Sequence, residues 1–140
     1  MVSIYQIKPK FQALLRPFTN GLASLGVTAN QVTIFAAILS IITGVLIYFY
    51  GEQLWTLLLV PIILLVRMAL NAIDGMLARD HSMESNLGAV LNELGDVISD
   101  VFLYLPLAVV LGFRSELIIL IVVFSIISEM VGVISVQIGA

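Results

Sequence analysis

Long apolar runs, separated by short polar breaks, are the most regular pattern along this chain. Residues 31–50 contain no charged side chain, and the run ends at Gly51-Glu52-Gln53. The next run is apolar to Val66 and continues as a helix-compatible string to residue 79. A helix that crosses a bilayer needs about 20 predominantly apolar residues. We therefore predict spanning helices over about 31–50 and 54–79.

The second half of the chain predicts two further spans. The segment of about 87–113 is polar in its first half and wholly apolar from Val101 onward. The segment of about 116–139 is interrupted only by Glu129 and by small or neutral polar residues. A short loop joins the polar end of 54–79 to the polar start of 87–113, so we expect these two ends to be neighbours.

The segment of about 9–25 has the periodicity of an amphipathic helix. Large apolar residues recur at i, i+3, i+4, i+7 and i+11: Phe11, Leu14, Leu15, Phe18 and Leu22. The pattern is typical of a helix in the membrane interface, and equally of a helix packed on the rest of the protein. Gly26 favours a helix end, and Thr28 with Gln31 has the spacing of a capping box, so the first span should start sharply.

Composition supports a membrane class. Of 140 residues, 61% are hydrophobic and 11% are charged, whereas a soluble domain has about 25% charged residues. The predicted fold class is therefore all-α: one polytopic transmembrane bundle over 1–140, with an interfacial N-terminal helix and four spans. Cysteine is absent, which excludes disulfides and thiolate sites. We expect no nucleic-acid partner.

The distribution of basic residues predicts the orientation in the membrane. Lys8, Lys10 and Arg16 precede the first span and Arg79 ends the second on the same side, whereas the opposite side has only Arg114. The side with more basic residues is expected to be cytoplasmic. Four spans bring both termini to that side.

Polar and ionisable residues gather where the second and third spans approach each other. Such residues are expensive in a membrane and by default indicate function. They are Arg67, Asn71, Asp74 and Arg79 on one span and Asn92, Glu93, Asp96 and Asp100 on the other. The asparagines and aspartates among them, spaced three or four residues apart on each span, form two facing rows of oxygen atoms. Such rows suit Mg²⁺ or Mn²⁺, which commonly bind through one or two carboxylates and substrate phosphates.

Small residues lie beside these rows at Gly75, Ala78 and Gly88. They allow a ligand to approach the backbone closely, or they serve only to pack the helices.

The segment NAIDGMLARDHSMESNLGAVLNELGD resembles the signature D-x2-DG-x2-AR-x8-G-x3-D-x3-D of the CDP-alcohol phosphotransferase (CDP-alcohol phosphatidyltransferase) family. Six of its specified positions match: Asp74, Gly75, Ala78, Arg79, Gly88 and Asp96. Asn71 and Asn92 hold the other two aspartate positions, as in a variant branch. The string VTANQVT at 27–33 resembles the family's T-P-N-x-x-T entry to its first span, which adds Asn30 and Thr33 as secondary candidates.

The resemblance implies a six-span fold of which this chain holds the first four spans, and a homodimer. It implies a cytoplasmic site in which two divalent ions, Mg²⁺ or Mn²⁺, hold the diphosphate of a CDP-alcohol, commonly CDP-diacylglycerol. An acceptor hydroxyl then attacks the phosphorus next to the lipid and CMP leaves. The setting would be phospholipid biosynthesis in a bacterial cytoplasmic (inner) membrane.

The resemblance also implies a role for each matched residue. Asp96 is the base that deprotonates the acceptor hydroxyl, and it also binds metal. Asp74 is a metal ligand, with Asn71 and Asn92 in the remaining metal positions. The donor is bound by Gly75, Ala78 and Gly88, which border the nucleotide, and by Arg79, which meets phosphate and suits it through bidentate hydrogen bonds.

Two rival functions stay open from the sequence. The two asparagines each remove a negative charge but keep an oxygen that can coordinate a cation, so the chain is either a transferase, with Glu93 or Asp100 in partial compensation, or a catalytically silent nucleotide-binding or lipid-binding relative. A transporter or channel fragment would also explain acids within the membrane. It would not explain the fixed spacing of the acids, the arginine and the small residues.

Several polar residues outside the signature have two readings. Asp100 is a secondary site residue or a paired carboxylate. Arg67 binds an acceptor or lipid phosphate, or it neutralises Asp100 or Glu129. We expect His81 to be a solvated loop residue, and Tyr50 and Trp55 to be interfacial anchors.

Overall fold

The computed structural model describes residues 4–138, and this part of the chain is helical without strands. The elements are α1 (Ile4–Ser24), α2 (Ala29–Tyr50), α3 (Leu54–Asp80), α4 (Asn86–Tyr104), the short 3₁₀ helix η1 (Leu105–Val109) and α5 (Ser115–Gln137). The predicted all-α membrane bundle is confirmed. Residue 139, the predicted end of the last span, lies outside the described residues.

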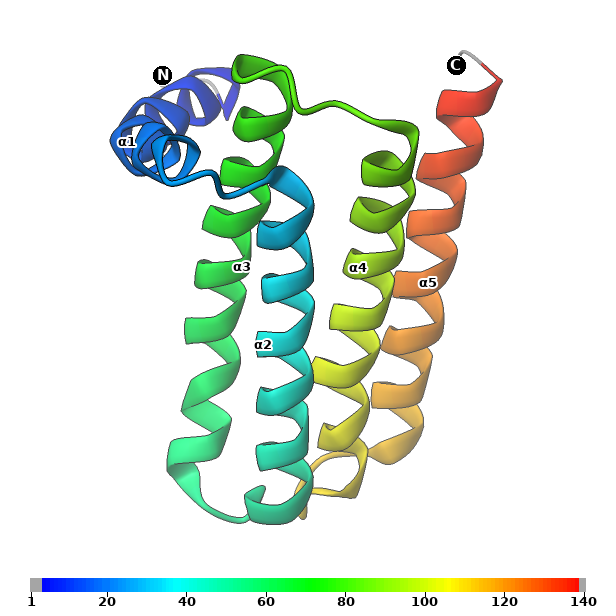
Figure 1. Cartoon of the computed structure of the whole chain (residues 1–140). Helices are drawn as coiled ribbons and strands as arrows, with labels where there is room; N and C mark the ends of the chain where they lie inside the picture. Colours follow the sequence, from blue (N-terminus) through cyan, green and yellow to red (C-terminus); the bar gives the residue numbers. More distant parts are fainter. Residues whose placement is uncertain (1–3, 139–140) are drawn as a thin grey trace.

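Helices α2 to α5 run side by side, and α1 lies across one end of the bundle (Figure 1). Helix α2 packs on both α3 and α4, α5 packs on α4 and η1, and α1 packs on α3. The loop of residues 81–85, which joins α3 to α4, lies at the same end as α1 (Figure 1). The polar ends of the second and third predicted spans therefore meet near α1.

Three helices of the described chain are long and apolar enough to cross a membrane, in the segments Ala29–Tyr50, Leu54–Asp80 and Ser115–Ser135. Helix α4 is shorter, at 19 residues, and it carries Glu93, Asp96 and Asp100. It nevertheless stands between α2 and α5 along the bundle (Figure 1). That this segment crosses the membrane stays a prediction.

The predicted third span, 87–113, is not one continuous α-helix. The α-helix ends at Tyr104 and continues as η1, in which Pro106 lies near the first position. Proline has no N–H to donate and its ring crowds the preceding turn, so it disrupts the regular hydrogen bonding at this point. The chain then turns back to α5 through Gly112, whose φ is 91°.

The junction between α1 and α2 is fixed by backbone hydrogen bonds. The N–H of Val27 donates to Leu22 O at 3.0 Å, the N–H of Gly26 donates to Ala23 O at 3.0 Å, and Gly26 has a φ of 78°. This is a Schellman ending, which requires a left-handed residue that glycine adopts without strain. The predicted capping box is present, with Thr28 and Gln31 bonded reciprocally. Helix α2 therefore begins at a defined residue, and its first turn lies at the end of the bundle near α1.

Helix α1 is anchored to the bundle, which supports the packed reading of its amphipathic pattern. Leu15 and Leu22 pack on a cluster formed by α2 and α3, and Arg16 forms an ion pair with Asp80 at 3.3 Å. The helix begins at Ile4, before the predicted start at about residue 9. Its other large residues include Phe18, which is 66% exposed, so a position in the membrane interface stays a prediction.

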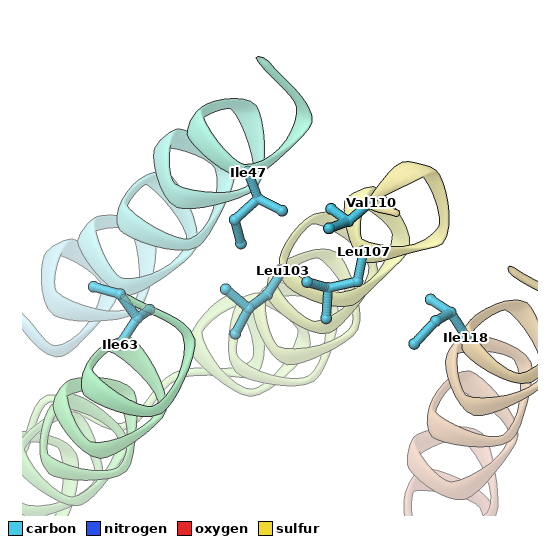
Figure 2. Close-up of a cluster of buried hydrophobic side chains, with 6 residues drawn as sticks. All are labelled: Ile47, Ile63, Leu103, Leu107, Val110 and Ile118. Carbon is cyan, nitrogen blue, oxygen red and sulfur yellow. The ribbon is translucent and has the colours of Figure 1, made fainter. Parts of the chain in front are cut away.

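The main apolar core lies at the end of the bundle away from α1 (Figure 2). Its buried members come from α2, α3, α4, η1, the residue after η1, and α5: Ile47, Ile63, Leu103, Leu107, Val110 and Ile118. Nearby, a Cβ added to Gly44 would overlap the backbone carbonyl of Phe102. Helices α2 and α4 thus approach backbone to backbone, which only glycine permits there.

Candidate active site

A cavity of about 440 Å³ opens between α2, α3 and the start of α4. It gathers ten of the residues that the sequence singled out: Asn30, Thr33, Asn71, Asp74, Gly75, Ala78, Arg79, Gly88, Asn92 and Glu93. Asp96, Asp100 and Arg67 are not among its lining residues. The signature residues other than Asp96 therefore surround one space. Asp96, which the resemblance makes the base, lies one helical turn beyond Asn92 and is not among the lining residues.

Asp74 is the buried carboxylate of this cavity, at 4% exposure. It accepts a hydrogen bond of 2.8 Å from Thr33 Oγ1. A buried carboxylate without partners is costly, so the hydroxyl that α2 presents stabilises the acid that α3 presents. The first turn of α2, set by its capping box, thereby fixes one side of the site.

Gly75 and Gly88 leave space in the cavity, and polar side chains lie next to that space. A Cβ added to Gly75 would lie 3.2 Å from Arg79 Nη1, and one added to Gly88 would lie 2.8 Å from Asn30 Oδ1. The guanidinium of Arg79 thus lies against the backbone at Gly75. Larger residues at either glycine would displace a polar group that borders the cavity.

Helix α4 begins at this cavity. Its N-cap, Ser85, accepts a hydrogen bond of 2.9 Å from the N–H of Gly88, and Ser85, Gly88 and Ala89 all line the cavity. The first N–H groups of a helix point outward without helical partners and favour anions. Together with Arg79, the start of α4 makes this space suited to phosphate.

Behind the cavity, Arg67 joins the two deeper carboxylates of α4. Its Nη2 lies 3.2 Å from Asp96 Oδ1, and its Nη1 pairs with Asp100 Oδ1. Asn71 Nδ2 donates to the same Asp96 oxygen at 2.8 Å, and Ser125 Oγ of α5 donates to Asp100 Oδ2 at 2.7 Å. Of the two readings of Arg67, the structure therefore has the pairing one, with Asp100 rather than Glu129 and with Asp96 in addition.

The donor atoms fit a divalent ion only in part. Within residues 4–138, no three histidine, cysteine, aspartate or glutamate side chains gather closely enough to hold a metal ion. The cavity does contain the carboxylate of Asp74 and the amides of Asn71 and Asn92. Mg²⁺ commonly binds through one or two carboxylates and completes its shell with water and substrate phosphates. The residues therefore fit an ion whose coordination shell is completed by oxygen atoms of a bound diphosphate.

Five lining residues were not expected from the sequence: Ala29, Met83, Glu84, Ser85 and Ala89. Ser85 carried a readable signal, because serine before an apolar helical pattern is a common N-cap. Met83 and Glu84 line the cavity because of the path of the α3–α4 loop, and Ala29 and Ala89 because of the packing of α2 and α4. No local sequence pattern predicts either.

Other residues weighed from the sequence lie elsewhere. His81 Nε2 is 3.2 Å from Asn20 Oδ1 of α1, outside the cavity. Glu129 lines a second, largely apolar cavity of about 480 Å³ between α4 and α5, which also includes Glu93. The rings of Tyr50 and Trp55 lie 6.3 Å apart at the end of the bundle that holds the α2–α3 turn.

Comparison with protein families gives a match over nearly the whole chain. Residues 26–139 match the family described as CDP-alcohol phosphatidyltransferase. The matched range begins at the α1–α2 turn and includes every cavity-lining residue. No solved structure matches the chain.

Similar proteins occur in bacteria and archaea. The inner membrane protein YnbA of Escherichia coli is 47% identical over 134 residues, which is 96% of this chain and 66% of that protein. The archaetidylinositol phosphate synthase of Pyrococcus horikoshii is 35% identical over 95 residues, 68% of this chain and 48% of that protein. An uncharacterized protein of Aquifex aeolicus is 30% identical over 104 residues, 74% of this chain and 50% of that protein. The chain thus spans between about half and two thirds of these relatives.

Proposed function

We propose, from the premise that this chain belongs to the CDP-alcohol phosphatidyltransferase family, that it transfers a substituted phosphate group from a CDP-alcohol to an acceptor alcohol. The observation that carries the proposal is the single cavity in which α2, α3 and α4 bring together Asp74, Arg79 and the two signature glycines. Phospholipid synthesis is the setting, and CDP-diacylglycerol is the proposed donor.

The donor's diphosphate binds between Arg79 and the start of α4. The guanidinium supplies paired N–H donors, and the first turn of α4 supplies further N–H groups. The nucleotide lies over Gly75, Ala78 and Gly88, where the backbone is uncovered. This position accounts for the glycines as well as for the charged groups.

Asp74, with amide oxygens of Asn71 and Asn92, would hold Mg²⁺ or Mn²⁺ together with the diphosphate. A divalent ion there supplies positive charge that stabilises the departing CMP phosphate. Because the protein contributes few charges, the site should bind metal weakly until the nucleotide is present.

Asp96 is the proposed base. Its two hydrogen bonds both go to Oδ1, and within the described residues Oδ2 has no side-chain partner. Asp96 takes the proton of the acceptor hydroxyl, the alcohol oxygen forms a bond to the phosphorus that carries the lipid, and the bond from that phosphorus to the CMP oxygen breaks. Its carboxylate is 26% exposed, so a small acceptor has access to it.

The protein's setting is proposed from its helices and its relatives. The apolar helices suit an integral membrane protein, and the Escherichia coli relative is named as an inner membrane protein. We extend this location to the present chain, as one domain with the cavity and both termini facing the cytoplasm, and with a homodimer as the assembled form.

A CMP-release assay tests the transferase proposal directly. The natural full-length protein would be incubated with CDP-diacylglycerol, Mg²⁺ or Mn²⁺ and a panel of acceptor alcohols. Acceptor-dependent CMP release supports the proposal, and Asp96→Asn should abolish it. No release with any donor and acceptor, in protein that still binds CDP, would instead establish the silent binding relative.

That alternative has two observations in its favour. Asn71 and Asn92 remove two charges from the site, and Arg67 already pairs with Asp96. A nucleotide-binding protein without turnover would retain the cavity and the glycines. CDP binding without CMP release distinguishes it from the transferase.

A further inference from the structure

Arg67 is the most deeply buried basic residue of this site, at 7% exposure. A buried guanidinium in a membrane protein is costly unless anions compensate it. Here the pairing carboxylates are Asp96 and Asp100, both on α4. The position of Arg67 is therefore fixed by two acids one helical turn apart.

The two acids are held differently. Asp100 is bonded through both oxygens, by Arg67 at Oδ1 and by Ser125 at Oδ2. Asp96 is bonded at Oδ1 alone, by Arg67 and Asn71. Asp100 and Ser125 therefore orient the arginine, and the arginine with Asn71 orients Asp96 while leaving its second oxygen accessible.

The amide of Asn71 is consistent with this arrangement. It presents its N–H to Asp96 at 2.8 Å, whereas an aspartate at this position would set a second carboxylate against the first. A further divalent ion at Asp96 would have to lie beside a guanidinium and an amide N–H. Like charges at such a distance repel strongly where water is scarce.

The orientation of the guanidinium also follows from its acids. Arg67 Nε is buried, and within the described residues it has no hydrogen-bond partner. Buried donors are usually satisfied. The side chain thus leaves one donor unbonded in order to reach both carboxylates.

We propose that Arg67 is a positioning residue that acts as a resident cation of the site: it occupies the charge position beside Asp96 Oδ1, so that the site takes one divalent ion, near Asp74, instead of two. The inference rests on the proposed function, because it concerns how Asp96 is prepared to receive the acceptor hydroxyl. This role explains why Arg67 and Asn71 both bond Asp96 Oδ1 and leave Asp96 Oδ2 free.

Counting bound Mn²⁺ tests this proposal without turnover. The full-length protein, saturated with CDP, should bind one Mn²⁺ per chain in electron paramagnetic resonance or calorimetric titrations. Arg67→Met should bind a second ion, because Asp96 loses its cation. Arg114→Met is the matched control, since Arg114 is exposed just before the start of α5 and pairs only weakly, at 3.9 Å, with Glu116. It should bind one.

The double variant Arg67→Met with Asp100→Asn removes a positive and a negative charge together, so Asp96 loses its cation while no unpaired charge is left at Asp100 to destabilise the fold. It should also bind a second Mn²⁺. Zero or two ions on the parent, or one ion on both Arg67 variants, would overturn the proposal.

Kinetics give a second and separate measurement. Arg67→Lys keeps the charge but loses the fork that reaches both acids, so it should still bind one Mn²⁺ while kcat for CMP release falls about 10- to 100-fold, as when residues that orient catalytic groups are changed. KM for the donor should change little. If the parent releases no CMP, the transferase proposal fails, and the Mn²⁺ count still decides the role of Arg67.

Discussion

The two ends of the helical bundle are built from the same helices but bury different kinds of side chain. Away from α1, Ile47 and Leu103 are fully buried among apolar neighbours. Toward α1, helix α3 buries Asp74, and near the middle of the same helix it buries Arg67. Apolar packing at one end fixes the relative positions of the helices, and these positions determine where the polar side chains lie at the other end. Stability and chemistry should therefore respond to different substitutions.

Two glycines on these helices also differ in role between the apolar end and the polar end. At Gly44, an added Cβ would meet the backbone of Phe102, so the residue lets two helices touch. At Gly88, an added Cβ would meet the side chains of Asn30 and Ser85 beside the cavity. One glycine closes the bundle, and the other leaves room for a ligand.

The largest expected effect lies at the polar end, in Asp96→Asn. The change keeps the size of the side chain but removes its ability to take a proton at neutral pH, so CMP release should fall by a factor of about 10² to 10⁴. CDP binding and the temperature of unfolding should change little. Asp80→Asn, outside the cavity and paired with Arg16, is the control. Equal turnover in the two variants would remove Asp96 from the mechanism.

Leu103→Ala tests the apolar end. Leu103 is fully buried, so truncation should lower the free energy of unfolding by about 2–5 kcal/mol. The affinity for CDP, measured at a temperature where the variant is folded, should be unchanged. Leu111→Ala, at a residue that is 80% exposed, should be nearly neutral. A loss of CDP affinity in folded Leu103→Ala would mean that the two ends are not separable.

Gly75→Leu should damage binding rather than folding. The new side chain would displace Arg79, whose Nη1 lies 3.2 Å from an added Cβ, so CDP affinity should drop at least roughly tenfold, or about 1.4 kcal/mol. Gly132→Leu is matched to it, because a Cβ there meets nothing within 4 Å. The proposed nucleotide position is wrong if both variants bind CDP as the parent does.

The smallest effect concerns charge at the signature's asparagines. Asn71→Asp with Asn92→Asp adds two negative charges to the cavity, so Mn²⁺ affinity without nucleotide should rise roughly two- to fivefold, as for partly exposed ion pairs worth up to about 1 kcal/mol. The parent should show a larger gain from added CDP than this variant does. Asn20→Asp on α1 is the control, and calorimetric titration is the measurement. An unchanged affinity would place the metal elsewhere.

Much of the fold could be predicted because apolar runs and caps are local signals. The bounds of α2 and α3 differ from the predicted spans by at most two residues, since Thr28, Gln31 and the break at Gly51 mark their ends. The end of α4 was missed because the apolar run continues past Pro106, and hydropathy alone does not register a change in backbone hydrogen bonding. The start of α1 was missed in a similar way, because the helix includes Pro9 instead of starting there.

The sequence predicted which residues form the site, but not which of their side chains pair with each other. Fixed spacing placed Asn71, Asp74 and Arg79 on one helix, and the loop length made the two polar segments neighbours. The sequence left Arg67 with a choice between Asp100 and Glu129 and did not suggest Asp96. That choice depends on the rotation of α3 relative to α4 and α5, which is set by packing on α2 rather than by any residue nearby in sequence.

The close contact at Gly44 also limits how the bundle moves. Where α2 and α4 touch backbone to backbone, the helices cannot come closer or slide past each other without a clash, so we expect any tilt between them to pivot at this contact. A small tilt of α2 relative to α4 about this contact would displace most the parts of the two helices farthest from it, around Asn30 and Gly88. The entrance for a lipid-linked nucleotide is therefore expected to widen and narrow as the helices tilt, whereas the packed apolar core at the other end should move little.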